Sequence, residues 1–238
     1  LGTALVVAGT TACVLIAAGL PLRHLAFAGA GLGGLILLFA AIEPYRRARL
    51  TSFLDPWAHA STSGFQSVQG QIALGSGGFH GVGLGESVQK IFYLPEAHTD
   101  FILAVIGEEL GMIGVCAILF LYGLLAYAGF RIAQKAKGTY AQLLAAGITS
   151  LILCQATLNV FTVLGLAPLT GVPLPFISYG STNLVVLLAG MGLLLNVADG
   201  GRIPLRVVEG SRRESGHRSR RDGGARGARA GGRRRAAG

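Results

Sequence analysis

Long apolar runs are the feature of this chain that most limits its fold. A helix needs about 20 residues to cross a hydrocarbon core of about 30 Å. Five runs meet that length, at residues 2–20, 24–42, 100–130, 141–166 and 181–198. Because 52% of the residues are hydrophobic and 13% charged, a water-soluble globule is excluded. We predict an all-α fold, a polytopic transmembrane helix bundle with about five spans.

The net charge of +9 belongs to the C-terminal tail rather than to the apolar part. Residues 1–198 hold 8 Lys and Arg against 7 Asp and Glu, whereas residues 199–238 hold 12 against 4. We therefore predict a membrane domain at 1–199, a disordered Arg/Gly-rich tail at 200–238, and no nucleic-acid partner. The tail either attracts anionic membrane lipids or is a solvated segment that only fixes topology.

Basic residues near the ends of the apolar runs predict the orientation, because cytoplasmic loops are enriched in Lys and Arg. With five crossings, one side receives the basic tail together with Arg23, Arg131, Lys135 and Lys137. The residues that argue for the opposite orientation are Arg46, Arg47, Arg49 and Lys90. We expect a multi-pass plasma-membrane protein with a cytoplasmic tail and an extracytoplasmic loop at 43–99.

Two irregular loops flank the later runs. In the first, Phe65, Val68 and Ile72 have helical spacing, which predicts a short interfacial helix with one face toward lipid. The glycine-dense residues 75–86 follow and predict a turn or re-entrant segment. The second loop, residues 166–182, holds three prolines and no charge. Such backbone persists at membrane depth only when protein buries it or when it lines a wet cavity.

Other site classes find no support in the sequence. The glycines lack the G-x-G-x-x-G spacing of a dinucleotide site. Cys13, Cys116 and Cys154 all lie inside apolar runs, which favours packed thiols over disulfides or metal ligands.

Asp100 is the best candidate for chemistry. Pro95 and Glu96 suit the first turn of a helix over residues 95–130, which places Asp100 near the outer membrane surface. Partial desolvation raises the pKa of a carboxyl group there toward the range of a general base. From the residues alone, an ordinary capping or ion-pairing Asp is the favoured explanation of the position.

Three motifs resemble one known family. They are FLDPW at residues 53–57, KIFYLPEAHTDFILAVIGEELG at 90–111 and PLPFISYG at 173–180. The chain resembles the SEDS family (FtsW, RodA, SpoVE) of bacterial cell-wall polymerases over residues 1–199, and Ala97 and GEELG are nearer to the division-type FtsW. The family continues PFISYG with Gly-Ser-Ser, whereas this chain has Ser181, Thr182 and Asn183, which puts the role of that loop in doubt. The start at Leu1 predicts a fragment without the family's earlier spans.

The resemblance implies a peptidoglycan glycosyltransferase with Asp100, the Asp of HTDF, as its catalytic residue. A sugar hydroxyl would attack the anomeric carbon of lipid II, and polyprenyl diphosphate would leave. That leaving group needs positive charge, from Lys90, Arg46 and Arg47 or from a divalent cation such as Mg²⁺ or Mn²⁺. The cofactor stays unknown, and no metal ligands are assigned. Contacts with lipid headgroups are an alternative explanation for Lys90 and the two arginines.

Further polar residues lie in the same motifs. His98, Ser178 and Tyr179 are candidates for substrate binding, although packing explains the last two as well. For Glu108 and Glu109 we expect buried, hydrogen-bonded roles, because unpaired charge at membrane depth is costly.

The resemblance also implies partners: lipid II, a monofunctional class B penicillin-binding protein with transpeptidase activity, other division proteins and membrane lipids, at the division septum. Two other functions stay open. Intramembrane acids and a proline-broken loop also suit a lipid II flippase, and a non-catalytic division scaffold fits a truncated chain with a basic tail.

Overall fold

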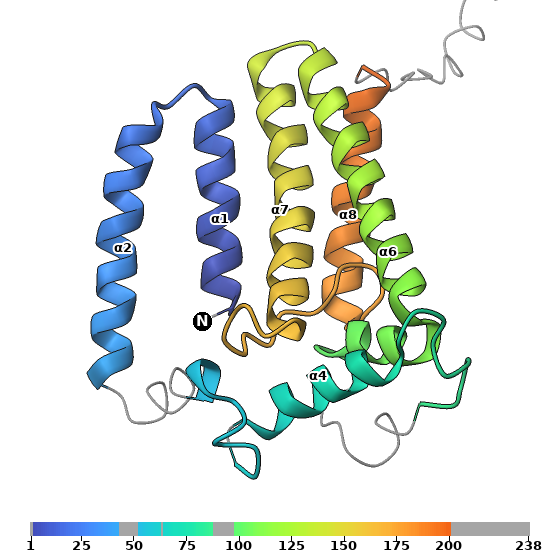
Figure 1. Ribbon diagram of the computed structural model, residues 1–238. Coiled ribbons are helices and arrows are strands. Elements are labelled where there is room, and N and C mark those ends of the chain that lie inside the picture. The colour runs from blue at the N-terminus through green and yellow to red at the C-terminus, as the bar shows by residue number, and fades with distance from the viewer. Residues whose placement is uncertain (1, 43–51, 63, 88–97, 201–238) are drawn as a thin grey trace, which may run out of the picture. The chain divides into compact units, whose positions relative to one another are not determined.

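The computed structural model describes residues 2–42, 52–62, 64–87 and 98–200 (Figure 1). The described residues all belong to one compact unit. Its helices are α1 (Gly2–Ala17), α2 (Leu22–Ile42), α4 (Phe65–Ser76), α6 (Ile102–Lys135), α7 (Thr139–Val163) and α8 (Ser181–Ala198). The described ranges contain no strand. The all-α prediction is therefore confirmed.

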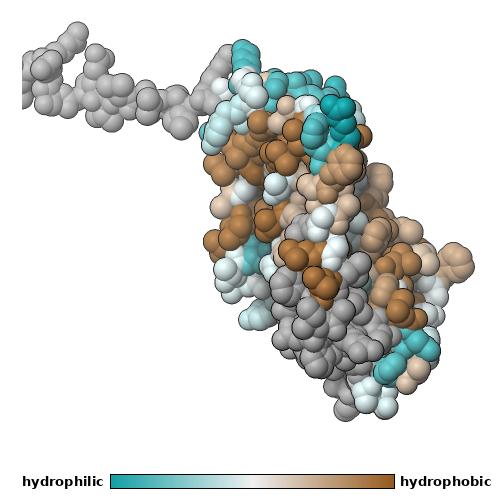
Figure 2. Space-filling model, turned by 90° about the vertical axis from the view of Figure 1, so that its left-hand side faces the viewer, coloured by the Kyte–Doolittle hydropathy of each residue, from teal (hydrophilic) through white to brown (hydrophobic). Residues whose placement is uncertain are grey.

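Helices α6, α7 and α8 are each long and apolar enough to cross a membrane. α1 is also apolar but has only 16 residues. A helix satisfies its backbone hydrogen bonds internally, which lipid requires of any spanning segment. Figure 2 shows apolar side chains over the middle of one face and hydrophilic ones toward both ends, as expected for a protein that contacts lipid.

Helix α7 lies at the centre of the packing and contacts α1, α6 and α8. The contact with α6 is close because Gly129 of α6 lies against Thr149 of α7, where a Cβ would come within 2.3 Å of the threonine Oγ. Ile152 of α7 and Leu187 of α8 are buried in the same apolar cluster. Small residues and apolar side chains thus hold the spanning helices together.

The predicted short helix exists as α4, but the expectation about its face was incomplete. α4 packs against α6 and α7. Val68 is only 4% exposed because protein rather than lipid covers it, while Ile72 on the same helix is 38% exposed. The Phe101 ring lies against Gly70, where a Cβ would approach it to 2.6 Å. α4 therefore supports the turn that precedes α6.

The prediction of one continuous helix over residues 95–130 was wrong in two respects. α6 begins at Ile102, so Asp100 precedes the helix rather than lying within its first turns. Within α6, Gly111 has φ 68° and ψ −163°, which interrupts the helical backbone. Pro95 and Glu96 lie outside the described residues.

The glycine-rich loop after α4 supplies the hydrogen bonds that the break in α6 removes. The amides of Val82 and Gly83 donate to the carbonyls of Glu108 and Glu109 at 2.9 and 3.1 Å. In return, the amides of Met112 and Ile113 donate to the carbonyls of Gly78 and Phe79 at 2.9 and 3.4 Å. The break is therefore a structured feature, because the loop satisfies backbone groups that would otherwise be costly to bury.

Glycine is required where these two backbones meet. A Cβ at Gly81 would lie 2.1 Å from the carbonyl oxygen of Glu109, and one at Gly77 would lie even closer to the carbonyl oxygen of Gly107, at 1.9 Å. Gly81 also has φ 79°, a conformation that side chains disfavour. The turn expected at residues 75–86 begins only after Ser76, where α4 ends, and its backbone hydrogen-bonds to α6.

Candidate functional site

Two segments that lie far apart in the sequence meet at the N-terminal end of α6. They are the HTDF turn, residues 98–101, and the proline-rich loop, residues 166–182. The amide of Tyr179 donates to the carbonyl of His98 at 3.0 Å. The hydroxyl of Ser178 donates to the carbonyl of Thr99 at 2.5 Å and accepts from the amide of Leu174 at 2.7 Å. Two of the motifs that suggested a function therefore form one structure around Asp100.

Asn159 of α7 hydrogen-bonds to both of these segments. Its side-chain Nδ2 donates to the carbonyl of Asp100 at 2.7 Å and to the carbonyl of Val172 at 2.8 Å. Asn159 is 1% exposed, so both bonds are shielded from water. One rigid helix thereby fixes the backbone that carries Asp100 relative to the loop opposite it.

Tyr122 of α6 anchors the other side of the proline-rich loop. Its hydroxyl donates to the carbonyl of Pro175 at 2.6 Å, and the tyrosine is 8% exposed. The next residue, Phe176, has φ 66°, which is uncommon for a residue with a side chain. Backbone strain of this kind persists only where surrounding contacts hold it in place.

The Asp100 side chain is partly buried beside Gly171 of the same loop. A Cβ at Gly171 would lie 3.3 Å from Asp100 Oδ2, so the bare glycine leaves room for the carboxylate. Asp100 also lies two residues before α6, where the positive end of the helix dipole favours the ionised form. The arrangement presents a carboxylate on a fixed backbone, as general-base chemistry requires.

The two acids further along α6 lie at its break. Glu108 is 3% exposed, and its Oε2 accepts a hydrogen bond of 2.5 Å from the hydroxyl of Ser87. Glu109 is partly buried, and its backbone carbonyl accepts from the glycine-rich loop. Both acids therefore lie where α6 and that loop exchange hydrogen bonds.

The remaining predicted site residues have different environments. The side chains of His98 and Tyr179 are exposed, the latter by 84%. Both bonding directions of the Ser178 hydroxyl are used within the loop contact. Arg46, Arg47 and Lys90 lie outside the described residues.

Sequence reasoning missed Asn159 and Tyr122. Asn159 belongs to a polar stripe on α7 with Gln155 and Thr162, at the spacing of one helical face. Gln155 donates to Asn183 Oδ1 at 3.3 Å, and Thr162 lies 3.2 Å from the Thr170 hydroxyl. An amide inside an apolar span was the available signal, because buried polar groups need partners.

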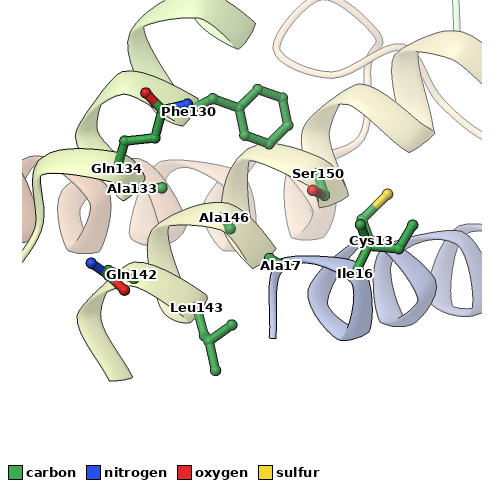
Figure 3. A pocket seen from close by; sticks show the side chains of 10 residues that line it. All are labelled: Cys13, Ile16, Ala17, Phe130, Ala133, Gln134, Gln142, Leu143, Ala146 and Ser150. Carbon is green, nitrogen blue, oxygen red and sulfur yellow. The ribbon is translucent and has the colours of Figure 1, made fainter. Parts of the chain in front are cut away.

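No cluster of three or more His, Cys, Asp or Glu side chains suited to a metal ion occurs among the described residues. Two cavities lie toward the end of the bundle opposite Asp100. One, of about 510 Å³, is lined by residues of α1, α6 and α7 that include Cys13, Phe130 and Ser150 (Figure 3). The other lies at the ends of α6 and α8.

Comparison with known proteins gives consistent matches. Residues 1–202 match the family of cell cycle proteins that comprises FtsW, RodA and SpoVE. Over 199 residues the chain is 46% identical to Stage V sporulation protein E of Bacillus subtilis (strain 168), covering 83% of this chain and 54% of that protein. Over 200 residues it is 44% identical to the probable peptidoglycan glycosyltransferase FtsW of Geobacter sp. (strain M18), with the same coverage.

Solved structures agree with this similarity. One, described as the structural coordination of polymerization and crosslinking by a peptidoglycan synthase complex, matches with a TM-score of 0.67 and 31% identity, over 85% of this chain and 56% of that chain. A mutant Rod shape determining protein RodA from Thermus thermophilus matches with a TM-score of 0.54 and 30% identity, over 83% and 49%. The chain spans about half the length of the curated relatives it matches.

Proposed function

Because the chain belongs to the FtsW, RodA and SpoVE family of cell cycle proteins, we propose that it contributes the catalytic aspartate, Asp100, to a peptidoglycan glycosyltransferase that polymerises lipid II during cell division. The observation that carries the proposal is the arrangement around Asp100. Asn159 bonds the Asp100 carbonyl, and Ser178 bonds the neighbouring Thr99 carbonyl. The carboxylate thus projects from a backbone that two separate elements hold.

The proposed reaction joins two lipid-linked glycans. A hydroxyl oxygen of the acceptor sugar forms a bond to the anomeric carbon of the donor. The bond from that carbon to the diphosphate oxygen breaks, and polyprenyl diphosphate leaves with the electron pair. Asp100 accepts the hydroxyl proton, a role that typically accelerates a reaction by about 10²- to 10⁴-fold.

Positive charge has to stabilise the departing diphosphate. Arg46, Arg47 and Lys90 are the proposed sources, and a divalent cation is the alternative source. The exposed His98 and Tyr179 side chains, on either side of the loop contact, are proposed to bind the glycan. For Ser178 we favour a positioning role, because its hydroxyl already makes two hydrogen bonds to backbone.

We further propose that the protein works with a monofunctional class B penicillin-binding protein and other division proteins at the septum. The similar peptidoglycan synthase complex supports a transpeptidase partner. Basic residues at the C-terminal end of α6 support placing that end and the tail in the cytoplasm. Asp100, at the other end of α6, then faces the outer leaflet.

The test is polymerisation of labelled lipid II by the complete protein with its penicillin-binding partner, read as glycan chain lengths on a gel. Asp100→Asn should abolish polymer formation, whereas the matched change Asp222→Asn, in the tail beyond the residues that match the family, should leave it intact. Equal polymer from wild type and Asp100→Asn would refute the role of Asp100. If wild type makes no polymer but moves lipid II across vesicle membranes, the flippase is favoured. If wild type shows neither polymerisation nor transfer, the scaffold is favoured.

A further inference from the structure

A basic cavity lies at the end of the bundle opposite Asp100. It has a volume of about 500 Å³ and lies where α6 and α8 end. Three cations line it, from the last turns of α6 and the connection to α7: Arg131, Lys135 and Lys137. One carboxylate, Asp199, also lines it. The volume is within the range of about 300–1,000 Å³ that is typical of small-ligand sites.

Arg131 is held in place by a neutral partner. Its Nη1 donates to the Tyr127 hydroxyl at 2.6 Å, and its guanidinium carbon lies 5.6 Å from the centre of the Tyr127 ring. A contact with tyrosine fixes the direction of the guanidinium without neutralising its charge. Most of the five N–H donors of an arginine stay available to an anion in such a geometry.

Apolar residues line the cavity beside the cations. Ala128 and Ile132 of α6 contribute to it, together with Val197 and Ala198 of α8. Cations and apolar residues in one cavity suit a ligand with an anionic head and a hydrocarbon chain. A soluble anion would contact only the cations and would leave the apolar residues without a partner.

Opposing charges reduce the attraction for an anion without reversing it. Asp199 contributes one negative charge, and the carbonyl ends of α6 and α8 carry partial negative charge. Three full positive charges exceed these contributions, and each basic group near a membrane surface attracts anionic lipid. The exposed faces of Tyr127 and Arg131 keep the cavity open to the surroundings.

We propose that this cavity binds the phosphate headgroup of an anionic phospholipid, with an acyl chain lying along the wall formed by α6 and α8. The site is separate from Asp100 and does not depend on the function proposed for it. Basic pockets between membrane helices are known to take such headgroups.

The experiment is native mass spectrometry of the complete protein in detergent, titrated with phosphatidylglycerol, phosphatidylcholine or soluble glycerol phosphate. Wild type should retain phosphatidylglycerol in preference to the other two. Combined Arg131→Gln, Lys135→Gln and Lys137→Gln should weaken this binding by about fivefold for each cation removed. The matched control removes the same charge from the tail, as Arg233→Gln, Arg234→Gln and Arg235→Gln, and should bind like wild type.

A second variant guards against altered folding or topology in the triple change. Ala198→Trp fills the cavity, keeps every charge, and should also release phosphatidylglycerol. The proposal is overturned if both cavity variants bind like wild type or if only the tail control loses binding. Equal retention of phosphatidylcholine, or equal binding of glycerol phosphate, would also overturn it.

Discussion

At the end of the bundle that carries Asp100, buried side chains hydrogen-bond to backbone carbonyls, whereas further along α6 and α7 the helices meet through small residues. Asn159 and Tyr122 make the first kind of contact, and the pair Gly129 and Thr149 makes the second. Apolar packing tolerates small shifts between helices, while a donor and acceptor pair fixes both distance and direction. The difference indicates which end needs a defined geometry.

The largest effect is expected where the glycine-rich loop enters α6. Gly81→Ala should destabilise the protein by at least about 3 kcal/mol, because the new Cβ meets the Glu109 carbonyl while φ stays positive. Gly85 also has positive φ, at 86°, but has open space around it. Gly85→Ala should therefore cost only about 1–2 kcal/mol. Thermal unfolding in detergent measures both, and equal losses would contradict the close backbone contact.

A somewhat smaller effect is expected where α6 and α7 meet through small residues. Gly129→Ala should cost about 2 kcal/mol, because its Cβ would press on Thr149 and separate α6 from α7. Gly123→Ala, in the same helix with nothing within 4 Å, should stabilise by about 0.5–1 kcal/mol. Adding Thr149→Ala to Gly129→Ala should recover part of the loss in the same unfolding assay. Failure of that rescue would argue against this contact.

The third effect tests one buried hydrogen bond. Tyr122→Phe removes the donor to the Pro175 carbonyl and should cost about 1–3 kcal/mol, since the carbonyl stays buried. Tyr140→Phe, at an 80% exposed position of α7, should change stability by less than about 0.5 kcal/mol. Comparing the two unfolding midpoints isolates the bond. Unchanged stability in Tyr122→Phe would mean that another donor bonds the Pro175 carbonyl.

The sequence predicts the helices well because each is a local pattern. The apolar runs at 141–166 and 181–198 lie close to the observed α7 and α8. The two motifs that meet at Asp100 were both singled out by their resemblance to the family. Their catalytic and binding roles stay predictions.

The contacts between these segments were not predictable from local patterns. Ser178 and Thr99 are 79 positions apart, and no periodicity relates them. The interruption at Gly111 depends on backbone groups supplied by residues 78–83. The apolar run that contains Gly111 carries no sign of these groups, so it predicts one continuous helix. Asn159 gives only an indirect signal, because a polar amide in a span predicts a partner without naming it.

The central claim is that the hydrogen-bonded end positions Asp100 for chemistry, and two amides of α7 test it directly. Asn159 and Gln142 both donate to a backbone carbonyl, but Asn159 bonds beside Asp100 and Gln142 bonds Ala136 at the opposite end. The measurement is the initial rate of lipid II polymerisation by complete, monodisperse protein with its transpeptidase partner. Asn159→Leu should lower kcat by about 100-fold with little change in KM, because a small misplacement of a reacting group is costly. Gln142→Leu should stay within about twofold of wild type, and equal rates from the two variants would contradict the account.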